Sequence, residues 1–201
     1  MDDRYLEPEL EPYVMALGQF ALAWNDLQYN LCELFSLACL DQPPRAGDTI
    51  SYLPHYVWHA IKSDRSQRDM LEAAIKHSKL GAGSEFGKHG KWLVDKVGSL
   101  EERRNNILHS PLMVLHVGND SRKIIANMYG RNPRAVKLNM AVDLLEDVRS
   151  ARDNAIKLSD YAYLLAMALM GAPRTAWPDK PELQGQRQKE KTATQTPTSH
   201  K

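Results

Sequence analysis

The sequence predicts an all-α protein, a helical bundle of four to five helices with a small β-hairpin insert. Two long segments carry apolar residues in alternating steps of three and four, which is the spacing of one face of an α-helix. Between them, the helical period gives way to two short apolar runs around a Gly-Asn-Asp-Ser turn. Prolines and glycines follow each periodic segment and indicate where each helix ends.

The first half of the chain predicts two helices. Apolar residues at helical spacing run from Pro12 to Leu40, about eight turns, and two consecutive prolines soon after Leu40 end the segment. A short apolar and aromatic segment, 54–61, precedes Ser63, which is a candidate N-cap for a second helix from Arg65 to Leu80. A Gly-Ala-Gly-Ser sequence then breaks the chain.

The second half predicts two more helices separated by the hairpin. A helix from Ser84 to Ser110 ends at Pro111, because the residue before a proline disfavours helical backbone angles. The hairpin insert covers about 112–129. The last helix runs from Asn139 to Met170 with strict three-four spacing, and a glycine and a proline follow it.

These elements predict one folded domain and a tail. Residues 1–171 form the helical domain, and the polar segment 172–201, with only a tryptophan and a leucine to bury, is expected to be a disordered tail. The apolar seams of the two long helices exceed what a single partner helix covers, so we expect the bundle to dimerise through them. The net charge of +1 combines this basic tail with a folded body of about −2, so bulk charge indicates no partner.

Cysteine usage and hydropathy favour a cytoplasmic protein with no membrane partner. Cys32 and Cys39 lie about 10 Å apart along one helix and cannot bridge each other. The longest strongly apolar run, Tyr161 to Met170, is about half of what a bilayer span needs. We expect no cofactor and no metal: His55 and His59 have a spacing that can hold zinc, but no third ligand accompanies them.

Arg104 interrupts an apolar stripe. Advancing about 100° per residue from Leu93, Leu100 lies at about −20° and Arg104 at about +20°, so the arginine is on the inward face of its helix. Burying an unpaired guanidinium is expensive, and the position predicts an acidic partner, an interface or a ligand phosphate. The alternative is an arginine whose stem packs on the core while its head reaches solvent. Glu101 and Glu102 are the acids expected to pair with Arg104 and Arg103 or to line a cleft.

The residues that follow Arg104 form a motif: Arg104-Asn105-Asn106-Ile107-Leu108-His109. The spacing alone is weak, since 13 arginines and 7 histidines give roughly 0.45 chance matches to Arg-x4-His in a chain of this length. A polar residue directly after the arginine, and a position in the last turns of a long helix, make the match more specific. In these features the chain resembles the HEPN superfamily, whose ribonuclease members carry Arg, a polar residue and a following His.

This resemblance implies a metal-independent endoribonuclease in which Arg104, Asn105 and His109 are catalytic. Arg104 would hold the phosphate, His109 would move protons and Asn105 would orient the pair, leaving a cyclic phosphate. It also implies a homodimer that brings two motifs together, and a setting in toxin-antitoxin systems or phage defence with a possible cognate antitoxin. Some HEPN toxins carry a tyrosine two residues after the histidine, where this chain has Pro111, so regulation through that tyrosine is not expected.

The segment that follows the motif is rich in basic residues, which could bind RNA phosphates. Five basic residues and no acid occur between positions 122 and 137, and a basic surface of this kind can follow a phosphate backbone. With Arg103, the candidate RNA-binding residues are Arg122, Lys123, Arg131 and Arg134. The alternative is a hairpin kept soluble by charge.

Two other functions fit the same residues. One is a noncatalytic HEPN-like module that binds nucleotide or RNA, or another protein, through the motif. The other is a purely structural helical interaction protein in which the motif match is accidental.

Overall fold

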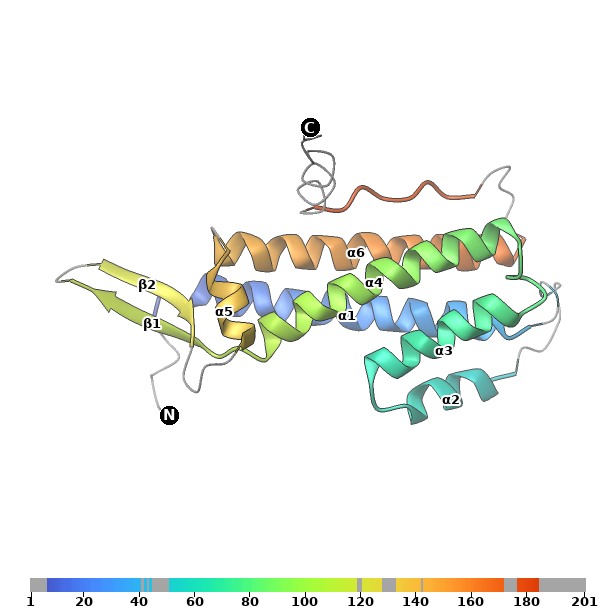
Figure 1. The fold of residues 1–201 in the computed structure, drawn as a ribbon, viewed down its shortest axis with the longest axis horizontal. Helices are drawn as coiled ribbons and strands as arrows, with labels where there is room; N and C mark the ends of the chain where they lie inside the picture. Colours follow the sequence, from blue (N-terminus) through green and yellow to red (C-terminus); the bar gives the residue numbers. More distant parts are fainter. Residues whose placement is uncertain are drawn as a thin grey trace, which may run out of the picture.

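The computed structural model describes residues 7–40, 42, 44, 51–118, 121–127, 133–141, 143–171 and 177–184. Within these ranges the chain forms six helices and one two-stranded antiparallel hairpin, which confirms the predicted all-α bundle with a small β-hairpin. Figure 1 shows an elongated bundle with the hairpin projecting from one end. No helix of the described ranges is both long enough and apolar enough to cross a membrane.

The two long helices, α1 (Glu11–Ala38) and α6 (Leu144–Leu169), lie side by side and run in the same direction (Figure 1). Two hydrogen bonds set their register: Arg152 donates to Gln19 at 2.7 Å, and Asn30 donates to the Ser159 hydroxyl at 2.9 Å. Their facing apolar residues make the centre of the core, where Leu27 and Leu158 are fully buried. Residues that are 130 positions apart in sequence therefore form the main helix pair.

A third long helix, α4 (Glu85–Leu108), crosses this pair in the opposite direction (Figure 1). Its N-cap is Ser84, whose hydroxyl accepts from the Gly87 amide at 3.0 Å. α3 (Asp64–His77) packs against α4 so closely that a Cβ on Gly90 would lie 2.7 Å from the Ile75 side chain. A short helix, α2 (Leu53–Ala60), covers the end of α1, where Trp58 is buried beside Phe35.

The hairpin consists of β1 (Leu112–Val117) and β2 (Ser121–Ala126), paired from Leu112↔Ala126 to Val117↔Ser121. β1 is half-buried over its first three residues and exposed over its last three, while Ile124 and Ala126 of β2 are buried. This agrees with the hairpin expected at about 112–129.

The segment between the hairpin and α6 differs from the prediction of a loop followed by one continuous helix from Asn139. A separate short helix, α5 (Pro133–Asn139), precedes α6, which begins at Leu144 behind an Asp143 N-cap. The Asn139 side chain accepts from the Ala126 amide and donates to the Ala126 carbonyl, each at 2.8 Å. Because that side chain fastens the end of α5 to β2, Asn139 ends one helix instead of starting the next.

Residues 177–184 also differ from the expectation of a disordered tail. They lie in an irregular, extended path along α4 and α6, and we call them the strap (Figure 1). Leu183 is only 8% exposed, and Trp177 stacks on His89 with ring centroids 5.8 Å apart. Asn154 of α6 binds both backbone groups of Gln184, at 2.9 Å and 3.1 Å. The remaining tail residues, 172–176 and 185–201, lie outside the described residues.

Candidate functional site

The motif lies in the last turns of α4, as the position of Pro111 predicts. Arg104 and Asn105 are within the helix and partly buried, and His109 is the C-cap residue. The His109 amide donates to the Asn105 carbonyl at 3.3 Å, which closes the last turn. The His109 side chain is exposed and bonds no other described residue. Its imidazole can therefore meet a ligand from solvent.

Arg104 is held by three neighbours from three parts of the chain. Its guanidinium lies 3.7 Å from the Asp64 carboxylate, 5.6 Å from the centre of the Trp24 ring, and donates to the Asn105 side-chain oxygen at 2.9 Å. The Trp24 indole N–H also donates to Asp64, at 3.2 Å. The inward position of Arg104 predicts an acidic partner, and Asp64 is that partner.

The local sequence explains why Asp64 stands there. Ser63 caps α3 by accepting from the Ser66 amide at 3.0 Å, so Asp64 is the first helical residue, where a carboxylate is stabilised by the helix dipole. From the sequence, Ser63 is recognised only as a candidate helix start, and neither Asp64 nor Trp24 is indicated as a neighbour of Arg104. The inward position of the Arg104 charge does predict an acidic partner, but it does not indicate where in the sequence that partner lies.

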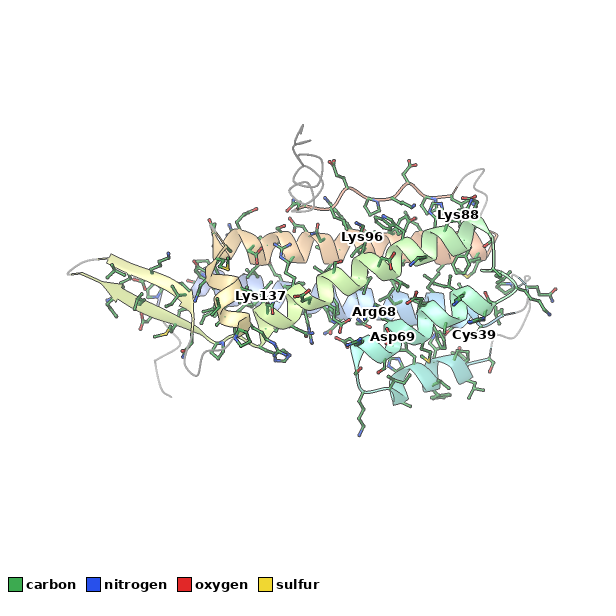
Figure 2. The ribbon with its side chains drawn as sticks, viewed as in Figure 1. Cys39, Arg68, Asp69, Lys88, Lys96 and Lys137 are labelled. Atoms are coloured by element: carbon green, nitrogen blue, oxygen red, sulfur yellow. The ribbon has the colours of Figure 1, made fainter. Side chains whose placement is uncertain are left out.

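Asn105 lines an open hollow of about 250 Å³ between α4 and α5. The hollow is also lined by Asn106, Pro133 and Arg134, and by an ion pair in which Lys137 meets Glu102 at 2.6 Å. Figure 2 shows Lys137 on α5, beside the end of α4. The hollow therefore joins a motif residue with two of the cations that follow the hairpin.

Glu101 and Glu102 were expected to pair with the two arginines or to line a cleft; the pairing is wrong, whereas Glu102 does line the hollow of Asn105. Glu101 binds Arg68 of α3, both side chains being less than 20% exposed, and Glu102 pairs with Lys137. Figure 2 shows Arg68 where α3 faces α4. On a helix, residues three or four apart share a face, but adjacent residues do not. Glu101 therefore points toward α3, while its neighbour Glu102 points toward α5.

Arg103 lies on another side of α4 from Arg104 and binds α6. Its guanidinium donates to the Asp147 carbonyl at 2.6 Å and also to the Asp147 carboxylate. A guanidinium held by a carboxylate and a carbonyl at once joins two helices. The candidate RNA-binding role of Arg103 therefore competes with a structural one.

The other candidate RNA-binding residues are spread over the hairpin end. Arg122 pairs with Glu9 at 3.2 Å and with Glu7 at 3.8 Å, both at the start of the α1 region. Lys123 is exposed and lines a second hollow, of about 430 Å³, beside Asp143. Arg134 lines the hollow of Asn105, and Arg131 lies outside the described residues.

Of the two histidines that have zinc spacing, only His55 contacts another helix. His55 bridges Ser36 at 3.1 Å and Glu33 at 3.0 Å, and so fastens α2 to α1, while His59 is exposed. No group of three or more metal-binding side chains occurs among the described residues.

Taken together, the motif offers three kinds of group at one end of α4: a guanidinium, an amide and an exposed imidazole. Five residues of helix rotate the side chain by about 500°, so Arg104 and His109 leave the axis about 140° apart. Arg104 points toward α3 and α1, whereas His109 stands at the exposed helix end. A ligand that touches both must wrap around the helix end or span two motifs.

Comparisons with protein-family models, with curated proteins and with solved structures each gave no match for this chain.

Proposed function

We propose that this chain is a metal-independent endoribonuclease of HEPN type. The observation that carries the proposal is that His109 is exposed one helical turn after Asn105. Asn105 in turn accepts a hydrogen bond from Arg104 and lines a hollow together with Arg134. An imidazole titrates near neutral pH and can transfer protons, and a guanidinium can bind a phosphate through two hydrogen bonds.

The chemistry needs no group beyond these. RNA carries its own nucleophile, the 2′-hydroxyl, which attacks the neighbouring phosphorus while the bond to the 5′-oxygen of the next nucleotide breaks. His109 accepts the proton that leaves the 2′-hydroxyl and donates it to the departing 5′-oxygen, and Arg104 stabilises the charge on the crowded phosphate. The products are a 2′,3′-cyclic phosphate and a free 5′-hydroxyl, and Asn105 keeps Arg104 in position.

The proposed RNA path runs from the motif across the hollow toward the hairpin. Arg134 and Lys123 contribute cations along it, so RNA binding is expected to weaken as salt rises. The proposed partners are RNA, a second copy of the chain and a cognate antitoxin, in a toxin-antitoxin or phage-defence system.

Incubation of the purified chain with RNA in the presence of a chelator tests the proposal. Cleavage is expected, with a cyclic phosphate at the new 3′ end, and His109→Ala is expected to lower the rate at least about 100-fold. His59→Ala, which removes an exposed histidine at the end of α2, is the matched control and should cleave like the unaltered protein. RNA that stays intact with the unaltered protein would contradict the nuclease.

One observation favours the second candidate, a noncatalytic module that binds nucleotide or RNA. The Arg104 guanidinium already has Asp64, Trp24 and Asn105 as neighbours, so it also serves as a structural contact between helices. In that case RNA binds, is not cleaved, and Arg134→Ala weakens its binding while His109→Ala does not. Measuring RNA binding and cleavage on the same samples separates the two candidates.

A further inference from the structure

Six large apolar side chains are exposed on the face that α1 and α6 form on the side away from α4. We call this the seam face, and its members are between 41% and 66% exposed: Met15, Leu22, Tyr29, Ile156, Tyr163 and Met170. Large apolar side chains that are exposed together on one side of a molecule indicate a candidate interaction surface.

The spacing shows that these residues form two parallel stripes. In α1 they follow one another at intervals of seven residues, from Met15 to Tyr29. The same interval separates Ile156 and Tyr163 of α6 and Met170, the C-cap residue of α6. A seven-residue interval keeps side chains nearly in line along one side of a helix, so each stripe lies on one side of its helix. The Gln19–Arg152 hydrogen bond joins α1 and α6 between the two stripes.

We propose that the seam face binds a second copy of this chain, with each α6 antiparallel to the α6 of the other copy and each α1 antiparallel to the other α1. A twofold axis that crosses both helix pairs gives this arrangement, and the same surface then serves both copies. The stripes of four helices would close over one another as in a four-helix bundle.

The charges on the face fit this orientation. Arg152 and Asp160 lie four residues to either side of Ile156, so an axis that passes Ile156 places Arg152 of each copy opposite Asp160 of the other. Within its own copy, the Arg152 guanidinium binds Asp153 and Gln19, which hold it at this edge of α6. Asp160 is exposed and bonds no other residue in the described part of the chain. A parallel arrangement would instead face each α6 with α1, bringing Asp160 toward the level of Asp26 and setting two acids together.

The size of the face is close to what a dimer needs. The stripe of α6 from Arg149 to Met170 is about 30 Å long, and two adjacent helices are about 20 Å wide. The product, roughly 600 Å² as a flat projection, approaches the ~800 Å² per partner of a stable interface.

This contact is separate from the motif. Asp147 of α6 binds Arg103 of α4 and lies nine residues before Ile156, which on a helix is half a turn away, so α4 is on the other side of the α1–α6 layer. A dimer through the seam face leaves Arg104 and His109 of each copy on its outer surfaces, so it does not itself join two motifs. The inference therefore does not rest on the proposed nuclease, and the two can fail independently.

The mass of the full chain in solution, measured by sedimentation at micromolar concentrations, tests the contact. The unaltered protein is expected to be a dimer, and Ile156→Glu and Tyr163→Glu are each expected to give a folded monomer, since both positions are solvent-exposed in the single chain. Arg65→Glu on α3, whose side chain is 78% exposed and lies away from the seam face, is the control and should stay dimeric.

A charge exchange tests the orientation. Arg152→Glu and Asp160→Arg are each expected to raise the dimer dissociation constant about tenfold or more, and the double variant is expected to restore it. The two positions are eight residues, about 12 Å, apart on one helix, so rescue cannot arise within one copy. Circular dichroism checks that each variant folds.

A monomeric unaltered protein, or a dimer that persists in both glutamate variants, would overturn the proposal. Single charge reversals that leave the dissociation constant unchanged, or a double variant no tighter than the singles, would overturn the antiparallel arrangement.

Discussion

Arg104 joins three helices through one guanidinium. It is 25% exposed, pairs with Asp64 over 3.7 Å and lies over Trp24, so part of its interaction is screened by solvent. Arg104→Met keeps the apolar stem and removes the charge, and leaves the Asp64 carboxylate with only the Trp24 N–H among these contacts. We expect a loss of about 1–2 kcal/mol in the free energy of unfolding, measured by urea denaturation.

Arg65→Met is the comparison for this experiment, because Arg65 is 78% exposed and should change the stability by less than about 0.5 kcal/mol. If Arg104→Met is as stable as Arg65→Met, Arg104 is not a structural contact, and its whole role lies with a ligand.

His89 connects the strap to α4 and α6. It stacks on Trp177 and hydrogen-bonds the Tyr161 hydroxyl. Burial, followed by the nearby Lys180 and Lys88 charges, lowers the pKa of His89 below its ordinary 6.5, although Glu85 opposes the shift. Below that ordinary value the unfolded chain takes up a proton that the folded chain resists, so the folded protein loses stability as the pH falls.

His89→Gln has no proton to gain at this position. We therefore expect its free energy of unfolding to fall less than that of the unaltered protein between pH 7 and the acid side of the ordinary histidine range. Urea denaturation at a series of pH values measures the difference. Equal slopes for the two proteins would show that the environment of His89 does not disfavour its protonated form.

For single residues, the sequence predicts where a side chain lies on its helix better than it predicts which residues that side chain contacts. The turn of the helix places Arg104 inward and His109 at the helix end, and the structure agrees on both. The identity of Asp64 as the partner depends on how α3 packs on α4, which no local pattern contains. Glu101 and Glu102 were assigned the wrong partners because adjacent residues on a helix point to different neighbours.

The strap is an element that adds to the core without regular secondary structure. Leu183 is buried, and Asn154 satisfies both backbone groups of Gln184. Leu183→Ala removes buried apolar contact and is expected to cost about 2 kcal/mol, while Asn154→Ala leaves those backbone groups without their partner and is expected to cost about 1–2 kcal/mol. Urea denaturation measures both values.

Gln184→Ala is the matched control for the strap. The Gln184 side chain is exposed and only its backbone is bound, so this variant should match the unaltered protein. Leu183→Ala and Asn154→Ala variants no less stable than Gln184→Ala would mean that the strap contributes nothing to the fold.

The long helices and the hairpin were predictable, but the short helix α5 and the strap were not. α1, α3, α4 and α6 follow from helical periodicity, and the bounds of the first three differ from the structure by only a few residues. α5 has seven residues, fewer than two full repeats of a helical pattern need, and its end is set by the tertiary contact of Asn139 with Ala126. The strap is rich in proline and charge, so composition favours disorder even though a few anchors are enough to hold it.

For the whole molecule, association through the seam face links stability to concentration. If only folded chains pair, the Tm rises with protein concentration, because the dimer draws the folding equilibrium forward. We expect this rise for the unaltered protein and for Arg65→Glu, and a constant Tm for Ile156→Glu. Calorimetry at protein concentrations that span a hundredfold range measures this rise in Tm. Such a range changes the stability of a folded dimer by roughly 2.7 kcal/mol. A Tm independent of concentration in all three proteins would contradict association.

The pairing of α1 with α6 also orders events during synthesis. Gln19 and its partner Arg152 are 133 residues apart, so at about 5–20 residues per second the ribosome needs roughly 7 to 27 s to make the second after the first. Throughout that interval the apolar side of α1 lacks its main neighbour, and only part of it can be covered by α2, α3 and α4. The nascent chain is therefore most exposed to aggregation and to chaperone capture before α6 emerges, and translation through residues 144–169 is the step that commits it to the native bundle.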